Sequence, residues 1–196
     1  MKRLGQLLLF GFIIACGMGG CTQHYSPKPR GYFRILFPDK AYHTFSSGCP
    51  YTFALPTYAK LEPDHSADAQ PCWMDIDFPQ FNARIHLSYM PVSSRDNFNE
   101  LVEDARTFAF NHTVRATAID QHRINHQAAN VYGLKYEIKG NTASNIQFFV
   151  TDSTRHYLRG ALYFHEKPRL DSIQPVLEFI KADIDTLISS LRWVSK

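Results

Sequence analysis

The segment at residues 151–159, "TDSTRHYLR", gathers side chains that hydrolases use. Asp152, Ser153 and His156 lie within five residues of one another, and these residue types form the triads of serine hydrolases. Triads are assembled from separated elements, however, and Ser153 lacks the G-x-S-x-G context of a nucleophile elbow. We therefore expect Asp152 and Ser153 to make local hydrogen bonds in a turn. A hydrolase or metal-dependent enzyme that uses residues 152–156 is kept as the alternative function.

Charged side chains of the same segment are candidates for binding a partner protein. Arg155 and Arg159 follow Asp152 within seven residues and are expected on a solvent-facing or partner-facing side of a strand. Because no catalytic constellation is convincing elsewhere in the chain, we predict Asp152, Arg155 and Arg159 as partner-binding residues and no catalytic residue.

Two further pairs have the spacing of metal ligands. Asp75 and Asp77 lie two apart, so on a strand they share one face, and paired carboxylates can exchange protons or bind a hard cation. No third ligand is evident. His122 and His126 lie four apart, which suits a metal on a helix, but the intervening residues are not clearly helical. We predict no metal, no cofactor and no small-molecule substrate.

Cys49 and Cys72 are the cysteines of the chain body. In an oxidising compartment they could form a disulfide, and closing a loop of roughly two dozen residues would stabilise the fold by about 3 kcal/mol in the chain-entropy model. The alternative is two free, buried thiols. A zinc site is disfavoured because neither cysteine has a nearby ligand partner.

The other two cysteines, Cys16 and Cys21, follow a segment typical of export signals. Positive charge at Lys2 and Arg3 precedes the apolar run "LLLFGFIIA" at residues 7–15, which is the pattern of a secretory signal peptide. The run is too short to span a bilayer. Small residues before cysteine resemble the lipobox of bacterial lipoproteins, in which the thiol is acylated. The sequence Gly-Gly-Cys favours Cys21 as the acylated residue, with Cys16 as the alternative.

The composition is that of one folded domain without affinity for nucleic acid. The chain has 196 residues, of which 14% are aromatic, and this argues against extensive disorder. Its 21 basic and 18 acidic residues nearly balance, so electrostatic binding to nucleic acid has no support. We predict a signal peptide at 1–20, a flexible tether at 21–31 and a single domain at 32–196.

Hydrophobic periodicity then predicts the elements that position these residues. Period-two alternation or apolar character predicts strands at 51–55, 73–78, 84–90, 116–124, 132–139, 146–151 and 157–164. Phe33, Ile35 and Phe37 alternate, which predicts a first strand or an ordered extension. Apolar stripes predict one helix capped by Asn97 and a long final helix capped by Asp171, with Pro175 in its first turn. The order predicts an α+β fold, an antiparallel sheet with two packed helices.

Five stretches resemble the gliding-motility lipoprotein family GldD of Bacteroidetes-type bacteria. They are "PKPRGYFRILFP" (27–38), "CPYTF" (49–53), "CWMDIDFPQFNARIHLSY" (72–89), "TDSTRHYLRGALYF" (151–164) and "LDSIQPVLEFIKADI" (170–184). The resemblance implies a non-enzymatic component of the gliding machinery, linked to the type IX secretion system. It also implies a lipidated cysteine about six residues before the Pro-Lys-Pro-Arg stretch, which is the place of Cys21. The element order further resembles Mog1/PsbP-like sandwiches.

These observations predict where the protein works. The acyl chains on Cys21 would hold it in a membrane, where its partners would be other gliding and secretion proteins. Thr22 is not the Asp that retains many lipoproteins at the inner membrane, and the following residues lack the acidic run of some surface lipoproteins. We therefore expect a periplasm-facing lipoprotein, on the outer membrane in preference to the inner membrane.

Overall fold

A computed structural model describes residues 34–46, 48–165 and 169–194 of the chain. Residues Leu36–Lys196 form one compact unit, and the fold below is that of this unit. Met1–Ile35 belong to a separate unit. Residues 1–33 lie outside the described residues. They include the predicted signal peptide at 1–20, the predicted tether at 21–31, Cys16 and Cys21.

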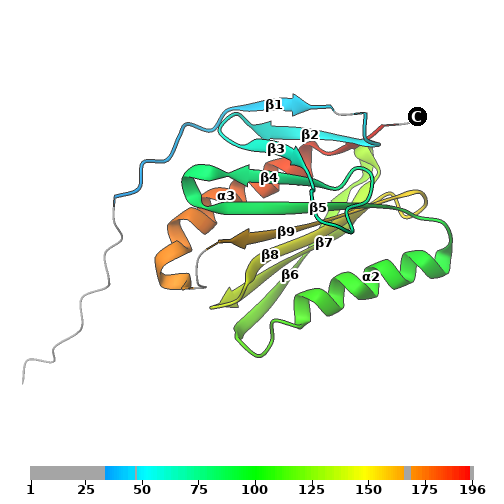
Figure 1. Ribbon diagram of the computed structural model, residues 1–196. Coiled ribbons are helices and arrows are strands. Elements are labelled where there is room, and N and C mark those ends of the chain that lie inside the picture. Colours follow the sequence, from blue (N-terminus) through cyan, green and yellow to red (C-terminus); the bar gives the residue numbers. More distant parts are fainter. Residues whose placement is uncertain (1–33, 47, 166–168, 195–196) are drawn as a thin grey trace, which may run out of the picture. The chain divides into compact units, whose positions relative to one another are not determined.

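A seven-stranded antiparallel sheet forms the centre of the fold (Figure 1). Its strand order is β3-β4-β5-β9-β8-β7-β6, and every neighbouring pair is antiparallel. The strands are β3 (Lys60–Pro63), β4 (Met74–Phe78), β5 (Ala83–Pro91), β6 (Ala116–His126), β7 (Val131–Gly140), β8 (Ser144–Thr151) and β9 (His156–Phe164). The central pairing of β5 with β9 joins segments far apart in the sequence, because α2, β6, β7 and β8 are inserted between them.

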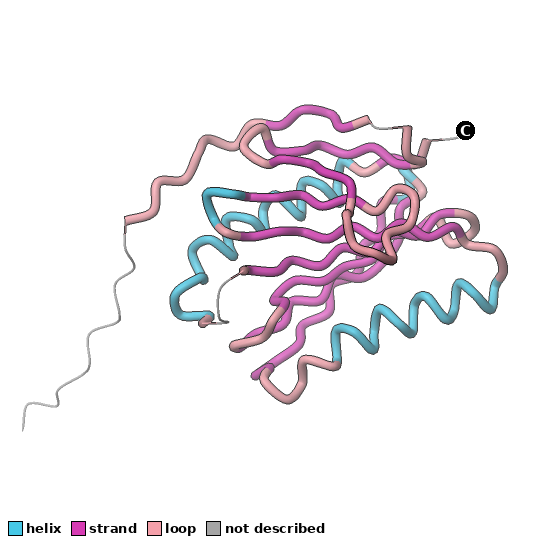
Figure 2. Tube along the Cα trace, viewed as in Figure 1, coloured by secondary structure: helices cyan, strands magenta, loops and turns pink. Residues whose placement is uncertain are grey.

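A second, three-stranded sheet and two helices cover the large sheet (Figure 2). The small sheet has the order β1-β2-β10, with β1 (Tyr42–Phe45), β2 (Tyr51–Pro56) and β10 (Arg192–Trp193). It shares the larger apolar core with α3 (Leu170–Ser190) on one face of the large sheet. Helix α2 (Arg95–Phe110) forms a smaller core on the other face. Short 3-10 turns, η1 (Pro79–Phe81) and η2 (Gln127–Ala129), join β4 to β5 and β6 to β7.

The alternation of β5 shows how the sequence sets this layering. Ile85 and Leu87 are buried in the larger core beside α3, whereas Arg84 and His86 lie on the opposite face, which α2 covers only in part. Successive side chains of a strand point to opposite faces, so the sequence pattern alone separates the two sides. The predicted α+β class, an antiparallel sheet with two packed helices, is confirmed.

The N-cap of helix α2 lies three residues before its predicted position. The hydroxyl of Ser94 accepts the Asn97 N–H at 3.1 Å, which makes Ser94 the N-cap. The side-chain oxygen of Asn97 in turn accepts the N–H of Ser93 at 3.2 Å. The prediction that Asn97 caps the helix is therefore wrong. Asn97 instead occupies the third helical position, and its side chain accepts from the residue before the N-cap, one residue earlier than in a capping box.

Helix α3 also begins differently from its prediction. Its first residue is Leu170, and the flanking Arg169 makes no side-chain cap. Asp171, the predicted cap, lies within the first turn. The N–H of Leu170 is satisfied by the side-chain oxygen of Asn141 at 2.8 Å, from the loop after β7. Pro175 lies inside the helix, beyond the first turn where its missing N–H would cost nothing.

Other boundaries depart from the sequence-based expectation where the chain lies at a sheet edge. Residues 34–41 form no strand, and the first strand is β1. Strands β1, β3 and β10 were not predicted. In the part of the chain that the structure describes, no helix has the length and apolar character to cross a bilayer.

Candidate functional site

Five segments that are distant in the sequence meet at one end of the large sheet. They are the residue before β2, the loop before β4, the end of β5, the start of β9 with the residue before it, and the residue after β10. Together they enclose a hollow of about 370 Å³. Its lining residues are Pro50, Pro71, Cys72, Tyr89, Arg155, His156 and Val194. We call it the disulfide-end hollow.

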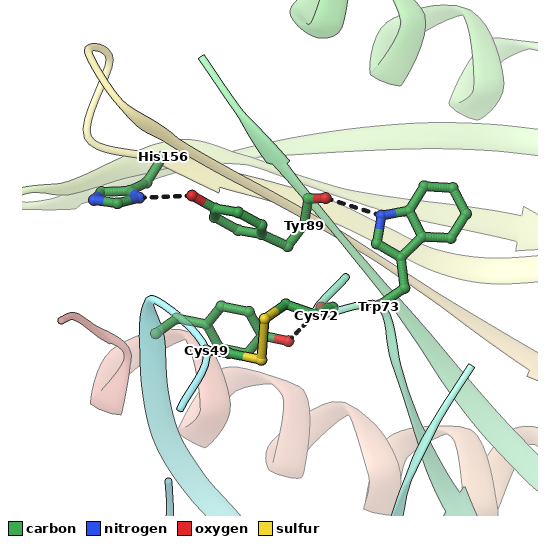
Figure 3. Close-up of a disulfide and its surroundings, with 6 residues drawn as sticks. Cys49, Cys72, Trp73, Tyr89 and His156 are labelled. Atoms are coloured by element: carbon green, nitrogen blue, oxygen red, sulfur yellow. Dashed lines mark hydrogen bonds between the residues drawn. A yellow bond between two sulfur atoms is a disulfide. The ribbon is translucent and has the colours of Figure 1, made fainter. Parts of the chain in front are cut away.

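In the structure a disulfide links Cys49 to Cys72 across the floor of this region (Figure 3). It joins the turn before β2 to the loop before β4, two segments 23 residues apart. The buried hydroxyl of Tyr51 donates to the carbonyl of Cys72 at 2.8 Å. Burial raises the pKa of Tyr51, so this hydroxyl keeps its proton and remains a donor. The backbone of Cys72 has φ +66°, a left-handed conformation that these two links hold in place.

Aromatic side chains form the opposite wall. His156 stacks on Trp193 with ring centroids 5.1 Å apart, and its Nδ1 lies 2.9 Å from the hydroxyl of Tyr89. The indole N–H of Trp73 donates to the carbonyl of Tyr89 at 2.8 Å (Figure 3). Burial lowers the pKa of His156, and the nearby Arg155 lowers it further, against an opposing effect of Asp152. His156 is therefore neutral at pH 7.

Asp152 shapes the turn between β8 and β9 and so positions the rim of the hollow. Its Oδ1 accepts three backbone N–H groups, those of Thr154 at 3.0 Å, Arg155 at 2.8 Å and His156 at 2.9 Å. Burial opposes ionisation, but these hydrogen bonds outweigh it and lower the pKa of Asp152. The residue is 6% exposed, so little of its side chain is available to contact a partner. Asp152 instead holds the exposed Arg155 at the rim.

The hydrolase constellation that was kept as the alternative is not assembled. Among the described residues, the carboxylate of Asp152 binds backbone N–H groups, while the ring of His156 faces Tyr89 and Trp193. Ser153 has φ +66° at the tip of the turn, and its N–H donates to the hydroxyl of Thr151 at 2.9 Å. A relay from serine through histidine to aspartate requires the carboxylate to orient the imidazole, and here it does not.

Arg159 lies apart from the hollow. It is three residues beyond His156 on β9 and therefore points to the opposite face of the sheet, the face that carries α2. Its guanidinium lies 4.4 Å from the Phe108 ring and donates to the side chain of Gln147 at 3.0 Å. Its Nε is buried without a hydrogen-bond partner. Of the three predicted partner-binding residues, Arg155 alone is exposed at the hollow.

The predicted metal-compatible pairs behave differently from each other. His122 and His126 lie on the extended strand β6, where four residues span about 13 Å, so a shared ion is out of reach. Asp75 and Asp77 do share a face, as expected, and both bind Arg84, whose Nη1 lies 3.0 Å from Asp75.

Two residues from other segments join this acidic pair on the uncovered face of the large sheet. His86 Nδ1 lies 2.6 Å from Asp75, and the ligand-capable atoms of Asp64, Asp75 and His86 lie within 4.8 Å of one another. Asp64 and His86 were not predicted as partners of this pair, because only strand pairing and a loop bring them to it. Since the Arg84 guanidinium already neutralises Asp75, a cation would have to compete with it. We assign no ion to this cluster.

Fold and site define a small antiparallel α+β domain with a disulfide-braced surface hollow. The chain belongs to the family described as gliding motility lipoprotein GldD, whose family model matches residues 22–193. No curated protein matches the sequence. Among solved structures, the chain is similar to the cyanobacterial PsbP protein (CyanoP) of Synechocystis sp. PCC 6803, with 11% sequence identity and a TM-score of 0.48. That similarity covers 90% of this chain and 99% of the other.

Proposed function

We propose that this gliding-motility lipoprotein is a non-enzymatic, lipid-anchored component of the gliding machinery, associated with type IX secretion, that acts by binding another machinery protein. Membership of the GldD family supports the link to gliding. In the proposed organisation, residues 1–20 are a cleaved signal peptide, Cys21 carries the acyl chains, residues 21–31 are a tether and residues 32–196 are the binding domain. Two or more acyl chains give stable anchoring, whereas one chain is marginal.

The proposed location is the periplasm, with the anchor in the outer membrane. Thr22 after the cysteine and the absence of a following acidic run support this location. An oxidising compartment would also maintain the Cys49–Cys72 disulfide. We propose that the bridge forms after export.

The proposed binding surface is the disulfide-end hollow, and the position of Arg155 carries this proposal. Arg155 is exposed at the rim, on a turn that Asp152 fixes with three hydrogen bonds. Pro50, Pro71 and Val194 provide apolar walls below it. A guanidinium above an apolar hollow suits a partner segment that carries a carboxylate next to an apolar side chain, because a fixed charge adds orientation to apolar contact.

Charge reversal at Arg155 tests the binding surface. The variant Arg155→Glu should reduce recovery of crosslinked machinery proteins from native membranes by about tenfold, because it places like charge against a carboxylate. Gliding should fall in parallel while the abundance of the lipoprotein stays unchanged. The matched control is Arg123→Glu, an exposed arginine on the edge strand β6. Equal recovery from both variants would reject the hollow as the binding surface.

A labelled fatty acid tests the anchor separately. The wild type and Cys16→Ser should incorporate the label, and Cys21→Ser should not. Label that persists in Cys21→Ser but disappears in Cys16→Ser would move the anchor to Cys16. No label on the wild-type protein would reject the lipid anchor altogether.

A further inference from the structure

Two consecutive apolar side chains are exposed where the domain begins. Leu36 is 78% exposed and Phe37 is 37% exposed. The Phe37 ring stacks on Phe179 of α3 at 4.5 Å and lies 5.6 Å from Phe81 of η1. We call these four residues the tether-side patch. Leu36 is its most exposed member, and nothing within the described residues covers it.

The tether-side patch lies at the end of the large sheet opposite the disulfide-end hollow. Strand β5 starts beside η1, where Ala83 pairs with Phe164, and it ends where Pro91 pairs with His156. A strand rises about 3.3 Å per residue, so the nine residues of β5 separate the two ends by roughly 25 Å. A surface that contacted the patch would leave the hollow free.

A cluster around one buried carboxylate fixes the start of the domain to α3. The carboxylate of Asp183, 2% exposed, accepts hydrogen bonds from the hydroxyls of Tyr42 and Tyr58, both at 2.8 Å, and from Lys40 at 2.7 Å. The ammonium of Lys40 also lies 3.3 Å from the centre of the Phe179 ring. We call Lys40, Tyr42, Tyr58 and Asp183 the Asp183 cluster. Because Lys40 is held four residues after Leu36, Leu36 is presented outward at a defined place on the domain.

The preceding chain has the charge that an anionic lipid surface attracts. Residues 22–35, "TQHYSPKPRGYFRI", contain three basic residues and no Asp or Glu. Polybasic segments near a membrane are drawn to anionic lipids. From Cys21 to Leu36 an extended chain spans at most about 54 Å, so acyl chains on Cys21 would keep Leu36 within reach of the bilayer. This step rests on the proposed lipid anchor.

We propose that the tether-side patch lies on an anionic lipid bilayer, with Leu36 inserted at the boundary of head groups and acyl chains. One inserted apolar residue is a weak contact by itself, but covalent anchoring makes it an intramolecular one. The contact sets the orientation of the domain. The disulfide-end hollow then faces away from the membrane, toward a protein partner.

Tryptophan quenching tests this contact on the full acylated protein. The protein is purified from its native membrane and reconstituted into vesicles of three parts phosphatidylcholine to one part phosphatidylglycerol, with brominated acyl chains. In the variant Leu36→Trp, the added emission should shift to the blue and lose about half its intensity, as expected for a side chain at the acyl boundary. The wild type is the matched control, because Trp73 and Trp193 lie at the disulfide end and should be quenched little.

The other outcomes separate the contact from the anchor. Protein that floats with the vesicles while the added tryptophan is unquenched overturns the bilayer contact and leaves the lipid anchor intact. A blue shift without quenching would mean that a second copy or another protein covers Leu36, which also overturns it. Equal quenching in phosphatidylcholine alone overturns the role of anionic lipid. Failure to float at all rejects the anchor and with it the proposed function.

Discussion

The two ends of the large sheet are held together by different chemistry. At the tether side, one buried carboxylate, Asp183, collects a lysine and two tyrosine hydroxyls. At the opposite end, a covalent bridge between Cys49 and Cys72 lies beside stacked and hydrogen-bonded aromatic rings. Both arrangements connect early segments of the chain to later ones, but one is ionic and the other covalent and aromatic.

This difference predicts which conditions should destabilise each end of the sheet. Burial, followed by the hydrogen bond to Asp183, raises the pKa of Tyr58, and burial also raises the pKa of Tyr42. Both hydroxyls therefore remain hydrogen-bond donors at neutral pH. The Asp183 cluster contains no disulfide, so a reductant should leave it unchanged. The disulfide end responds to a reductant, and it holds the two groups of the hollow whose pKa values are lowered, Asp152 and His156. The predictions below probe this contrast from the largest expected effect to the smallest.

Removal of the central carboxylate should be the most damaging change. Asp183→Ala removes a buried carboxylate that accepts hydrogen bonds from a lysine and two half-buried tyrosine hydroxyls, and the loss of several hydrogen bonds to a charged group costs about 3–5 kcal/mol. We expect urea unfolding of the purified mature protein to show a loss of that size. The matched control is Asp185→Ala, two residues along the same helix and half-exposed beside Lys135, which should cost about 1 kcal/mol or less. Equal losses would contradict a special role for Asp183.

Loss of the disulfide should rank second. Replacing both cysteines by alanine frees a loop of 23 residues, and the chain-entropy model gives about 3 kcal/mol. The urea midpoint should fall by a corresponding amount. Dithiothreitol should lower the midpoint of the wild type toward that of the double variant and leave the double variant unchanged. A reductant-insensitive wild type would show that the two thiols are free in the purified protein.

The turn at the rim should depend on the charge of Asp152. Asp152→Ala removes the acceptor of three backbone N–H groups and should cost about 1–3 kcal/mol. The folded-state pKa of Asp152 lies below its ordinary value of 3.8, so its contribution is present above about pH 4 and is lost as the pH falls below it. Unfolding curves of both proteins from pH 7 to pH 2.5 should therefore converge at the acid end. A gap that stays constant over this range would contradict the charge-dependent role.

His156, a base where Asp152 is an acid, should have a smaller effect on the free energy of unfolding. Its pKa is lowered from 6.5, so below about pH 6.5 the unfolded chain takes up a proton before the folded one does. The stability of the wild type should fall as the pH decreases from 7.5 to 5.5, by about 1 kcal/mol or less. His156→Phe keeps a ring on Trp193 and should reduce this slope, and the remaining slope is expected from His112, whose pKa is also lowered by burial. An unchanged slope in His156→Phe would assign the titration to another group.

The sequence predicts the longer strands of the fold well and the short strands β1, β3 and β10 poorly. Ile85 and Leu87 alternate with polar residues on β5 because one face of the strand packs on the α3 core and the other faces solvent. This alternation predicts the strand from the sequence. Strand β3, "KLEP", has no such pattern. It exists because it pairs with β4, and pairing is a property of the partner strand.

The candidate site divides in the same way. The hydrogen bonds of Asp152 are local, and a turn was expected from the Asp-Ser pair. The wall formed by Tyr89 and His156 is supported by Trp73 and Trp193, which come from other segments of the chain. No short sequence pattern indicates these contacts. Helix starts were misplaced for a related reason. Asp171 is a good capping residue by type, but the tertiary contact from Asn141 satisfies the first amide of α3 instead.

The place of β10 has a consequence for how the body can be built. Trp193 of β10 pairs with Tyr51 of β2, and Asp183 of α3 binds Lys40. Two early segments of the domain therefore depend on two late segments for their contacts. A chain threaded through a translocation pore with its amino terminus first would keep those early segments without their mates until almost every residue had passed. Such a domain would stay unfolded during translocation. It would fold only after translocation, when its last strand and helix reach the segments that they pair with.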